Sequence, residues 1–213
     1  MTSSVVHLSR LARWGVTLAR RRALVGIEND PNAPATVRSL VRLARLATLT
    51  GKRGKPDYAG AFRAIGPAAI KLGQSLATRP DLVGEEAANN LLSLQDSLPP
   101  VPFAQIKAAI ESSFGQPIEK LFAEIDPVPV GAASIAQVHK GITTDGRKVA
   151  IKVLRPGIRE KFARDITTYE WAAAQLEAMS PEAQRLRPRL TVENFRRWTL
   201  RELDLRREAA AIK

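Results

Sequence analysis

Two segments of the chain have residue types that could bind the phosphates of a nucleotide. The first is a run of small residues, Gly-Ala-Ala-Ser-Ile-Ala-Gln-Val at residues 131–138, and the second is Val-Ala-Ile-Lys at residues 149–152. Small side chains let backbone N–H groups approach phosphate oxygens closely. Lys152 could reach the same phosphates, while Ala150 on its face leaves room for a base and Val138 covers that base. The two segments therefore predict a phosphate-binding loop followed by a lysine strand.

The order and spacing of these segments are those of a kinase nucleotide clamp, with alanines in place of most of the loop glycines. A loop of small residues is weak support by itself, because such turns are common. The alternative is an ordinary amphipathic hairpin whose Lys152 extends its aliphatic stem towards solvent. We favour nucleotide binding, because the loop and the lysine strand occur together at hairpin spacing.

A β-hairpin is predicted to position the lysine. Strands are expected at residues 137–142 and 147–153, and Thr-Thr-Asp-Gly at 143–146 forms the turn between them. Apolar residues of the second strand alternate with Ala150 and Lys152, which share the other face.

Helices are predicted on both sides of this hairpin. One begins at Pro67 and is stopped by Pro80. Glycine in the middle of a helix is unfavourable, so we expect close packing of another element to require Gly73. Another has apolar residues at helical spacing from Phe103 and ends at Gly115. The chain returns to helix from Ile158, and a last helix is expected from near Thr191 to the C-terminus.

The first sixty residues are strongly basic. They hold eleven Lys/Arg and three Asp/Glu, a net +8 of the chain's +12. Their pattern predicts two arginine-rich amphipathic helices. These helices could lie on an anionic lipid surface, or they could simply pack on the rest of the protein.

Composition excludes several classes of site. The chain has no cysteine and two histidines, so disulfides, thiolate metal sites and histidine-based catalysis are not expected. The sequence shows no apolar run of membrane-spanning length and no secretory signal, and we expect a cytoplasmic protein peripheral to a membrane surface. Nucleic acid is an unlikely partner, because aromatic residues are only 5% and no stacking platform is visible.

Further motifs resemble those of one family. Lys71-Leu-Gly-Gln74 matches a K-x-G-Q signature, and residues 94–100 match the region after it. Residues 132–139 match an alanine-rich loop, and Arg155-Pro-Gly157 follows the lysine strand. Residues 201–209 contain an E-x-D motif with a glutamate beyond it. Over roughly residues 60–210 the chain is similar to the UbiB family of atypical kinase-like proteins, also called AarF-domain or ADCK proteins.

The resemblance implies a helix-rich α+β fold, in which a helical N-terminal extension precedes an incomplete protein-kinase-like N-lobe with a small antiparallel sheet. Together with the charge pattern, it leads us to expect three segments: a basic helical arm (1–58), a helical extension with the K-x-G-Q motif (59–125) and the partial lobe (126–213). It also implies ATP with Mg²⁺ as cofactor and ATP-dependent support of ubiquinone biosynthesis at a membrane.

The resemblance also assigns roles to residues. Lys71 would pair with Glu202 or Asp204, and Lys152 would bind phosphate with Glu208 as its ion-pair partner. The implied motif residues are Lys71, Gln74, Glu202 and Asp204. The implied nucleotide-binding residues are Gly131, Ala132, Ala133, Ser134, Ile135, Ala136, Val138, Ala150, Lys152 and Glu208.

This sequence departs from the family pattern in two respects. Gly131 stands where the family usually has alanine, and Ala136 where it usually has glycine. No H-x-D-x-x-x-x-N or D-F-G motif occurs, so the catalytic base and the metal ligands are missing from this chain.

The sequence therefore leaves enzymatic activity open, and we expect no phosphoryl transfer by this chain alone. Possible partners are a nucleotide, an anionic membrane or polyprenyl lipid, ubiquinone-pathway proteins and a separately encoded C-terminal lobe. The alternative function is a non-enzymatic helical module that binds lipid or protein.

Overall fold

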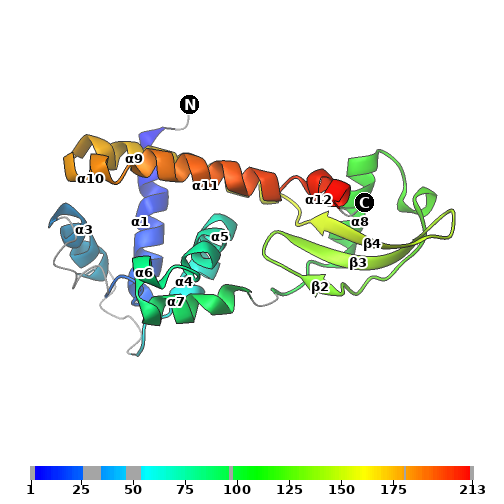
Figure 1. The fold of residues 1–213 in the computed structure, drawn as a ribbon, viewed down its shortest axis with the longest axis horizontal. Helices are drawn as coiled ribbons and strands as arrows, with labels where there is room; N and C mark the ends of the chain where they lie inside the picture. The colour runs from blue at the N-terminus through cyan, green and yellow to red at the C-terminus, as the bar shows by residue number, and fades with distance from the viewer. Residues whose placement is uncertain (1–2, 26–34, 47–53, 96–97, 180, 212–213) are drawn as a thin grey trace. The chain divides into compact units, whose positions relative to one another are not determined.

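The computed structural model describes residues 3–25, 35–46, 54–95, 98–179 and 181–211 (Figure 1). The chain forms two compact units. The first unit comprises Met1–Gln95 and Ala163–Arg196, and the second comprises Asp96–Phe162 and Arg197–Lys213. The predicted helix-rich α+β class is confirmed. The division into segments 1–58, 59–125 and 126–213 stays a prediction. The two units are defined by spatial contacts and each combines parts that are distant in the sequence, so they do not test where sequence segments begin and end.

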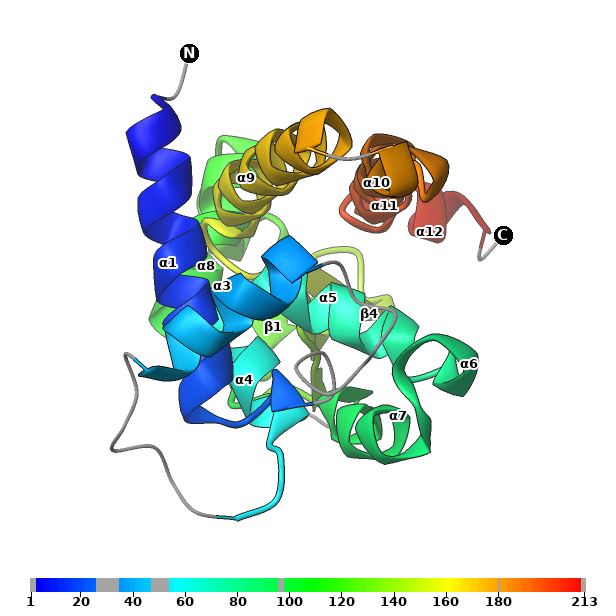
Figure 2. The same ribbon diagram turned by 90° about the vertical axis from the view of Figure 1, so that its left-hand side faces the viewer.

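The first unit is helical in its described part (Figure 2). Its elements are α1 (Ser4–Arg20), α3 (Ala35–Leu46), α4 (Tyr58–Ile65), α5 (Pro67–Leu76), α6 (Pro80–Val83), α7 (Glu85–Leu92), the 3-10 turn η1 (Ser93–Gln95), most of α9 (Ile158–Met179), α10 (Pro181–Arg185) and the start of α11 (Pro188–Glu202). The two helices predicted in the basic arm are α1 and α3.

Helix α5 carries the K-x-G-Q motif and lies close to α4, η1 and α7. Pro67 occupies its first turn, as predicted, where its missing N–H costs no helical hydrogen bond. Gln74 Nε2 donates to the carbonyl of Leu94 at 2.8 Å. A Cβ at Gly73 would clash with Leu94 and lie 2.8 Å from Phe62 Cδ1, so the expected packing reason for this glycine is present.

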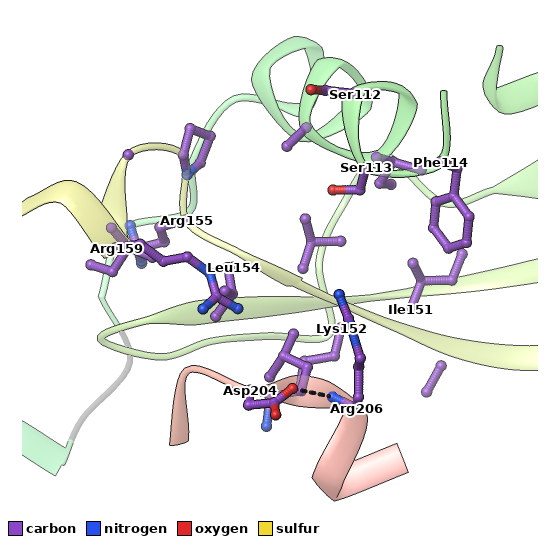
Figure 3. Close-up of a pocket in the computed structure, with 18 of the residues that line it drawn as sticks. Ser112, Ser113, Phe114, Ile151, Lys152, Leu154, Arg155, Arg159, Asp204 and Arg206 are labelled. Atoms are coloured by element: carbon purple, nitrogen blue, oxygen red, sulfur yellow. Dashed lines mark hydrogen bonds between the residues drawn. The ribbon is translucent and has the colours of Figure 1, made fainter. Parts of the chain in front are cut away.

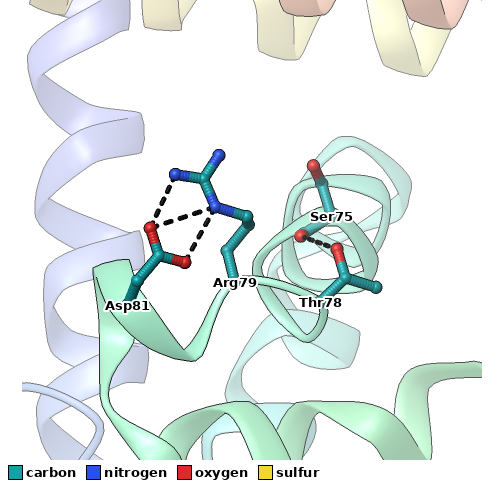
Figure 4. A network of polar contacts seen from close by, with 4 residues as sticks. All are labelled: Ser75, Thr78, Arg79 and Asp81. Atoms are coloured by element: carbon teal, nitrogen blue, oxygen red, sulfur yellow. Dashed lines mark hydrogen bonds and ion pairs between the residues drawn. The ribbon is translucent and has the colours of Figure 1, made fainter.

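The corner after α5 is closed by polar contacts (Figure 4). Thr78 Oγ1 donates to the carbonyl of Ser75 at 2.8 Å. The Arg79 guanidinium pairs with Asp81 through Nε and Nη2, at 2.8 and 2.7 Å, and these bonds lower the pKa of Asp81. Helix α5 ends at Leu76, three residues before the predicted stop, and Pro80 begins α6.

Helix α1 packs on α9 within the first unit. His7 is buried, with Nδ1 3.1 Å from Thr168 Oγ1 and its ring stacked on Trp171. Trp14 contacts Tyr169, whose pKa is raised by burial. Helix α1 of the basic arm therefore packs on the protein through one face, which was one of the two predicted uses of the arm's apolar stripes.

The second unit contains a four-stranded antiparallel sheet with β3 at its centre. Strand β4 pairs with β3 from Ala136 to Ile142 and occupies one side of β3. Strands β1 and β2 therefore pair with the other side of β3, at its two ends. The elements are α8 (Phe103–Phe114), the 3-10 turn η2 (Ile118–Lys120), β1 (Phe122–Ile125), β2 (Gly131–Ala132), β3 (Ala136–Thr143), β4 (Lys148–Leu154), the first residues of α9, the end of α11 and α12 (Leu205–Ala211). Figure 1 shows α8 and α12 beside this sheet.

The core of the second unit lies between α8 and the sheet. Ile106 and Ile110 of α8 are buried with Ile118, and Ile151 and Val153 of β4 pack against them. The hairpin was predicted to within one residue at each end, whereas β1 was missed. Gly115 ends α8 in the left-handed conformation, with φ of 67°, as predicted.

We predict that Gly73→Ala destabilises the protein although alanine favours helix over glycine. The added methyl group meets Leu94 and Phe62, and such overpacking costs roughly 1–3 kcal/mol. Thermal unfolding of the purified chain measures the effect. Gly15→Ala is the matched control, because its Cβ would lie 4.0 Å from Ala44 Cβ and the helix propensity gain of up to about 1 kcal/mol remains. Equal shifts in both variants would contradict the packing explanation.

Candidate functional site

One face of β3 and β4 gathers the predicted nucleotide-binding residues of the hairpin. In the strand register, Val138 lies opposite Lys152 and Lys140 lies opposite Ala150. Because side chains alternate along a strand, these four residues share a face. The other face presents Ile151 and Val153 to the α8 core. The expected arrangement, with Ala150 beside the lysine and Val138 across from it, is therefore present.

Lys152 forms an ion pair with Glu208 of α12. Its Nζ lies 2.7 Å from Oε1 and 2.6 Å from Oε2, so both carboxylate oxygens accept. The two side chains are 38% and 51% exposed. This is the ion pair that the family resemblance implied for these two residues. In this geometry the carboxylate fixes the ammonium over the shared face of β3 and β4.

The E-x-D motif forms a break between two helices. Glu202 ends α11, and Asp204 precedes α12 and accepts a hydrogen bond from the Arg206 N–H at 3.3 Å, in the manner of a helix N-cap (Figure 3). Arg159 Nη2 donates to the carbonyl of Leu203 at 2.5 Å. The prediction of one helix from near Thr191 to the C-terminus was wrong, since the aspartate cap starts a second helix that carries Glu208.

The alanine-rich segment forms a tight turn between β2 and β3. The N–H of Ala133 donates to the carbonyl of Ala136 at 2.8 Å. Neither Gly131 nor Ala136 has positive φ, and nothing lies within 4 Å of a Cβ placed at Gly131. The two departures from the family pattern therefore impose no backbone strain here. Arg155 donates to carbonyl oxygens of this turn, a contact that the sequence did not predict.

A buried polar network supports the strand that follows the turn. Gln137 and His139 are fully buried. Gln137 Nε2 donates to His139 Nε2 at 2.8 Å, so His139 Nδ1 carries the proton that it donates to the Asp126 carbonyl, also at 2.8 Å. Gln137 Oε1 accepts from the Val101 N–H. His139 is therefore structural, as expected, and the network fastens the segment before α8 to the sheet.

A pocket of about 910 Å³ runs along β4 in the second unit (Figure 3). Ala150, Lys152 and Asp204 line it, whereas residues 131–138 do not. Its charged lining is mainly cationic, which suits an anionic ligand. These charged residues are Lys152, Arg155, Arg159, Glu160, Asp204 and Arg206. Sequence reasoning missed Arg159 and Arg206. Their positions in the sequence could have indicated them, because Arg159 comes shortly after the lysine strand and Arg206 lies beside the E-x-D motif.

The remaining motif residues lie in different units. Lys71 and Gln74 are in the first unit, and Glu202 and Asp204 are in the second. Gln74 holds α5 to Leu94, as described above. The predicted pairing of Lys71 with Glu202 or Asp204 stays a prediction. Among the residues that the structure describes, no group of three or more His, Cys, Asp or Glu could hold a metal ion.

The arrangement belongs to a known class of protein. A family model described as the ABC1 atypical kinase-like domain matches residues 93–213. The chain is therefore a member of the ABC1 atypical kinase-like family.

Two curated relatives are each named "Probable protein kinase UbiB". The protein of Aeromonas salmonicida is 41% identical over 79% of this chain and 32% of its own length. That of Marinobacter nauticus is 43% identical over 70% of this chain and 27% of its own. The chain thus spans less than a third of the length of these relatives. A structure described as the Rv3197–erythromycin complex from Mycobacterium tuberculosis aligns with 82% of this chain and 41% of its own, at 30% identity and a TM-score of 0.48.

We predict that Asp204→Ala loosens α12, because the helix loses its N-terminal side-chain acceptor at a cost of about 1 kcal/mol. Hydrogen exchange of the α12 amides should become roughly fivefold faster. Asp204→Asn is the control, since asparagine keeps the acceptor and removes the charge. Equal acceleration in both variants would show that the charge, and not the cap, holds this helix.

Proposed function

We propose that this chain binds ATP on the face of β3 and β4 that carries Lys152, as the nucleotide-binding part of a UbiB-like protein. The observation that carries the proposal is the ion pair between Lys152 and Glu208. Glu208 holds the ammonium in place beside Ala150, which is the arrangement that kinase-like sites use to position a phosphate-binding lysine.

Each residue has a chemical role in this proposal. Lys152 contacts the phosphates, and Glu208 keeps the ammonium from folding away into solvent. Ala150 leaves room for the base, and Val138 covers it from across the hairpin. The turn at residues 133–136 supplies the backbone N–H groups of Ser134 and Ile135. The cationic lining of the neighbouring pocket supports an anionic ligand.

The function proposed for the larger protein is support of ubiquinone biosynthesis. The support is similarity to relatives that are named UbiB, of which this chain covers less than a third. Mg²⁺ is the cation that ATP would bring. Because the described residues contain no metal-binding group, we assign no step to the metal. Polyprenyl lipids and ubiquinone-pathway proteins belong to the same proposal as partners of the larger protein.

We predict that Lys152→Ala weakens ATP binding at least about tenfold, because the substitution removes a charge-assisted contact to phosphate. Glu208→Gln should have a smaller effect in the same direction, since the ammonium then loses its ionic partner. Equilibrium binding of a fluorescent ATP analogue to the whole chain measures both. Lys120→Ala removes the same charge from an exposed position in η2 and should leave binding unchanged. If ATP fails to bind, or binds the Lys152→Ala variant equally well, the proposal is wrong.

The exposed face of α1 favours a second function, association with an anionic membrane surface. Val5 and Leu8 are 73% and 54% exposed, and Arg13 and Arg20 are exposed on the same helix. Apolar and arginine side chains together suit the boundary between lipid headgroups and acyl chains. No helix among the described residues has the length and hydropathy to cross a bilayer. This function does not need the nucleotide, and it is the non-enzymatic alternative.

We predict that the chain binds vesicles with anionic lipid more tightly than neutral vesicles, and that raising salt weakens binding because the attraction is screened. Vesicle co-sedimentation measures both effects. Leu8→Ser should reduce binding by removing an inserted side chain. Leu92→Ser alters another leucine, 45% exposed on α7, and should have no effect. Equal binding to neutral and anionic vesicles would show that electrostatic attraction to anionic lipid does not contribute to membrane binding.

A further inference from the structure

The carbonyl groups of the alanine-rich turn are held on one side by Arg155. Its Nε donates to the Ala133 carbonyl at 2.9 Å, and its backbone N–H donates to the Ile135 carbonyl at 2.9 Å. Two of the oxygens that could repel a phosphate are therefore occupied. A free carbonyl that faced an anion would be electrostatically unfavourable, so the orientation of these peptide groups matters for any phosphate at the turn.

The donors of the same turn are left open. Within the described parts of the chain, the N–H groups of Ser134 and Ile135 donate to no acceptor. As whole residues, Ser134 and Ile135 are 7% and 8% exposed, and backbone N–H groups of folded proteins that pair with no protein acceptor usually pair with water or a ligand. The N–H of Ser134 shares a trans peptide with the Ala133 carbonyl and points away from it. Two successive N–H groups without an acceptor are donors that an anion could use.

Arg155 also reaches beyond the turn. Its Nη2 donates to the Pro99 carbonyl at 3.0 Å, and the Leu98 N–H donates to the Ala132 carbonyl at 2.9 Å. The guanidinium thus links the turn to the segment before α8. Arg155 forms no ion pair with an acidic side chain among the described residues, and burial lowers the pKa of Arg155. A guanidinium can bridge the two carbonyls with separate N–H groups in a fixed plane, whereas a lysine ammonium is a single point.

We propose that Arg155 is a positioning residue that orients the turn at residues 133–136, so that its N–H groups and not its carbonyls face the nucleotide phosphates. This inference rests on the proposed ATP binding. It extends the site from Lys152 to a residue just beyond the end of the same strand. Figure 3 shows Arg155 at the end of the pocket where β4 leads into α9. Arg155 acts through the backbone of the turn, and Lys152 acts on the phosphates themselves.

The test compares Arg155→Met, Arg155→Lys and the unsubstituted chain. Competition against a fluorescent ATP analogue gives the affinities for ATP and for adenosine. Both variants should bind ATP about tenfold more weakly, because neither bridges the two carbonyls. The affinity for adenosine should change by less than about twofold, because adenosine has no phosphate to meet the turn. Arg147→Met is the control, since Arg147 is exposed in the hairpin turn and pairs only with Asp145 there.

Hydrogen exchange provides a readout that needs no nucleotide. In both Arg155 variants the amides of Ala133 and Leu98 should exchange about tenfold faster, because their acceptors lie in the loosened turn and strand. Circular dichroism tests whether each variant is folded. If Arg155→Met does not fold, the comparison of Arg155→Lys with the unsubstituted chain tests the proposal.

The outcomes separate the two proposals. Equal ATP affinity in all folded variants overturns the role of Arg155 while ATP binding stands. Full retention by Arg155→Lys alone overturns the bridging role in favour of simple charge. An equal loss of ATP and adenosine binding shows general damage and also overturns the inference. Failure of the unsubstituted chain to bind ATP defeats both proposals.

Discussion

The alternation of side chains along β4 is the constraint on which the second unit depends. Residues of one parity, Ile151 and Val153, must enter the core under α8, because that is where their apolar surface is buried. Residues of the other parity, Ala150 and Lys152, are then forced onto the opposite face. A register shift of one residue would expose the core residues and bury the lysine. The burial of a few aliphatic side chains thus fixes where the candidate site lies.

The ion pair on that face contributes to position more than to stability. Lys152 and Glu208 are 38% and 51% exposed, and pairs of such exposure contribute roughly 0–1 kcal/mol. The geometry of this ion pair is instead set by residues next to α12. Asp204 caps α12, and Arg159 holds the Leu203 carbonyl just before that helix. The helix break therefore directs Glu208 to the lysine, while the strand alternation directs the lysine to Glu208.

Local signals predicted the hairpin, and non-local contacts escaped prediction. The turn sequence before Arg147 and the alternating apolar residues are sufficient to place β3 and β4. Strand β1 has only four residues, and its pairing with the end of β3 is not encoded in its own pattern. The break at Asp204 was hidden by helix-forming residues on both sides. The contacts of Arg155 join residues 22 and 56 positions apart, so no spacing rule reveals them.

The turn explains how alanine can serve where kinase-like loops usually have glycine. Glycine is favoured in a loop where φ is positive, and neither Gly131 nor Ala136 has positive φ. The turn closes instead through the Ala133–Ala136 hydrogen bond, and its carbonyls are fixed by Arg155. Alanine restricts the unfolded chain more than glycine does, so ordering this turn costs less conformational entropy. In the proposed ATP complex, a phosphate would therefore meet a turn whose ordering costs less entropy than that of a glycine loop, and its affinity would depend on how well the N–H groups fit it.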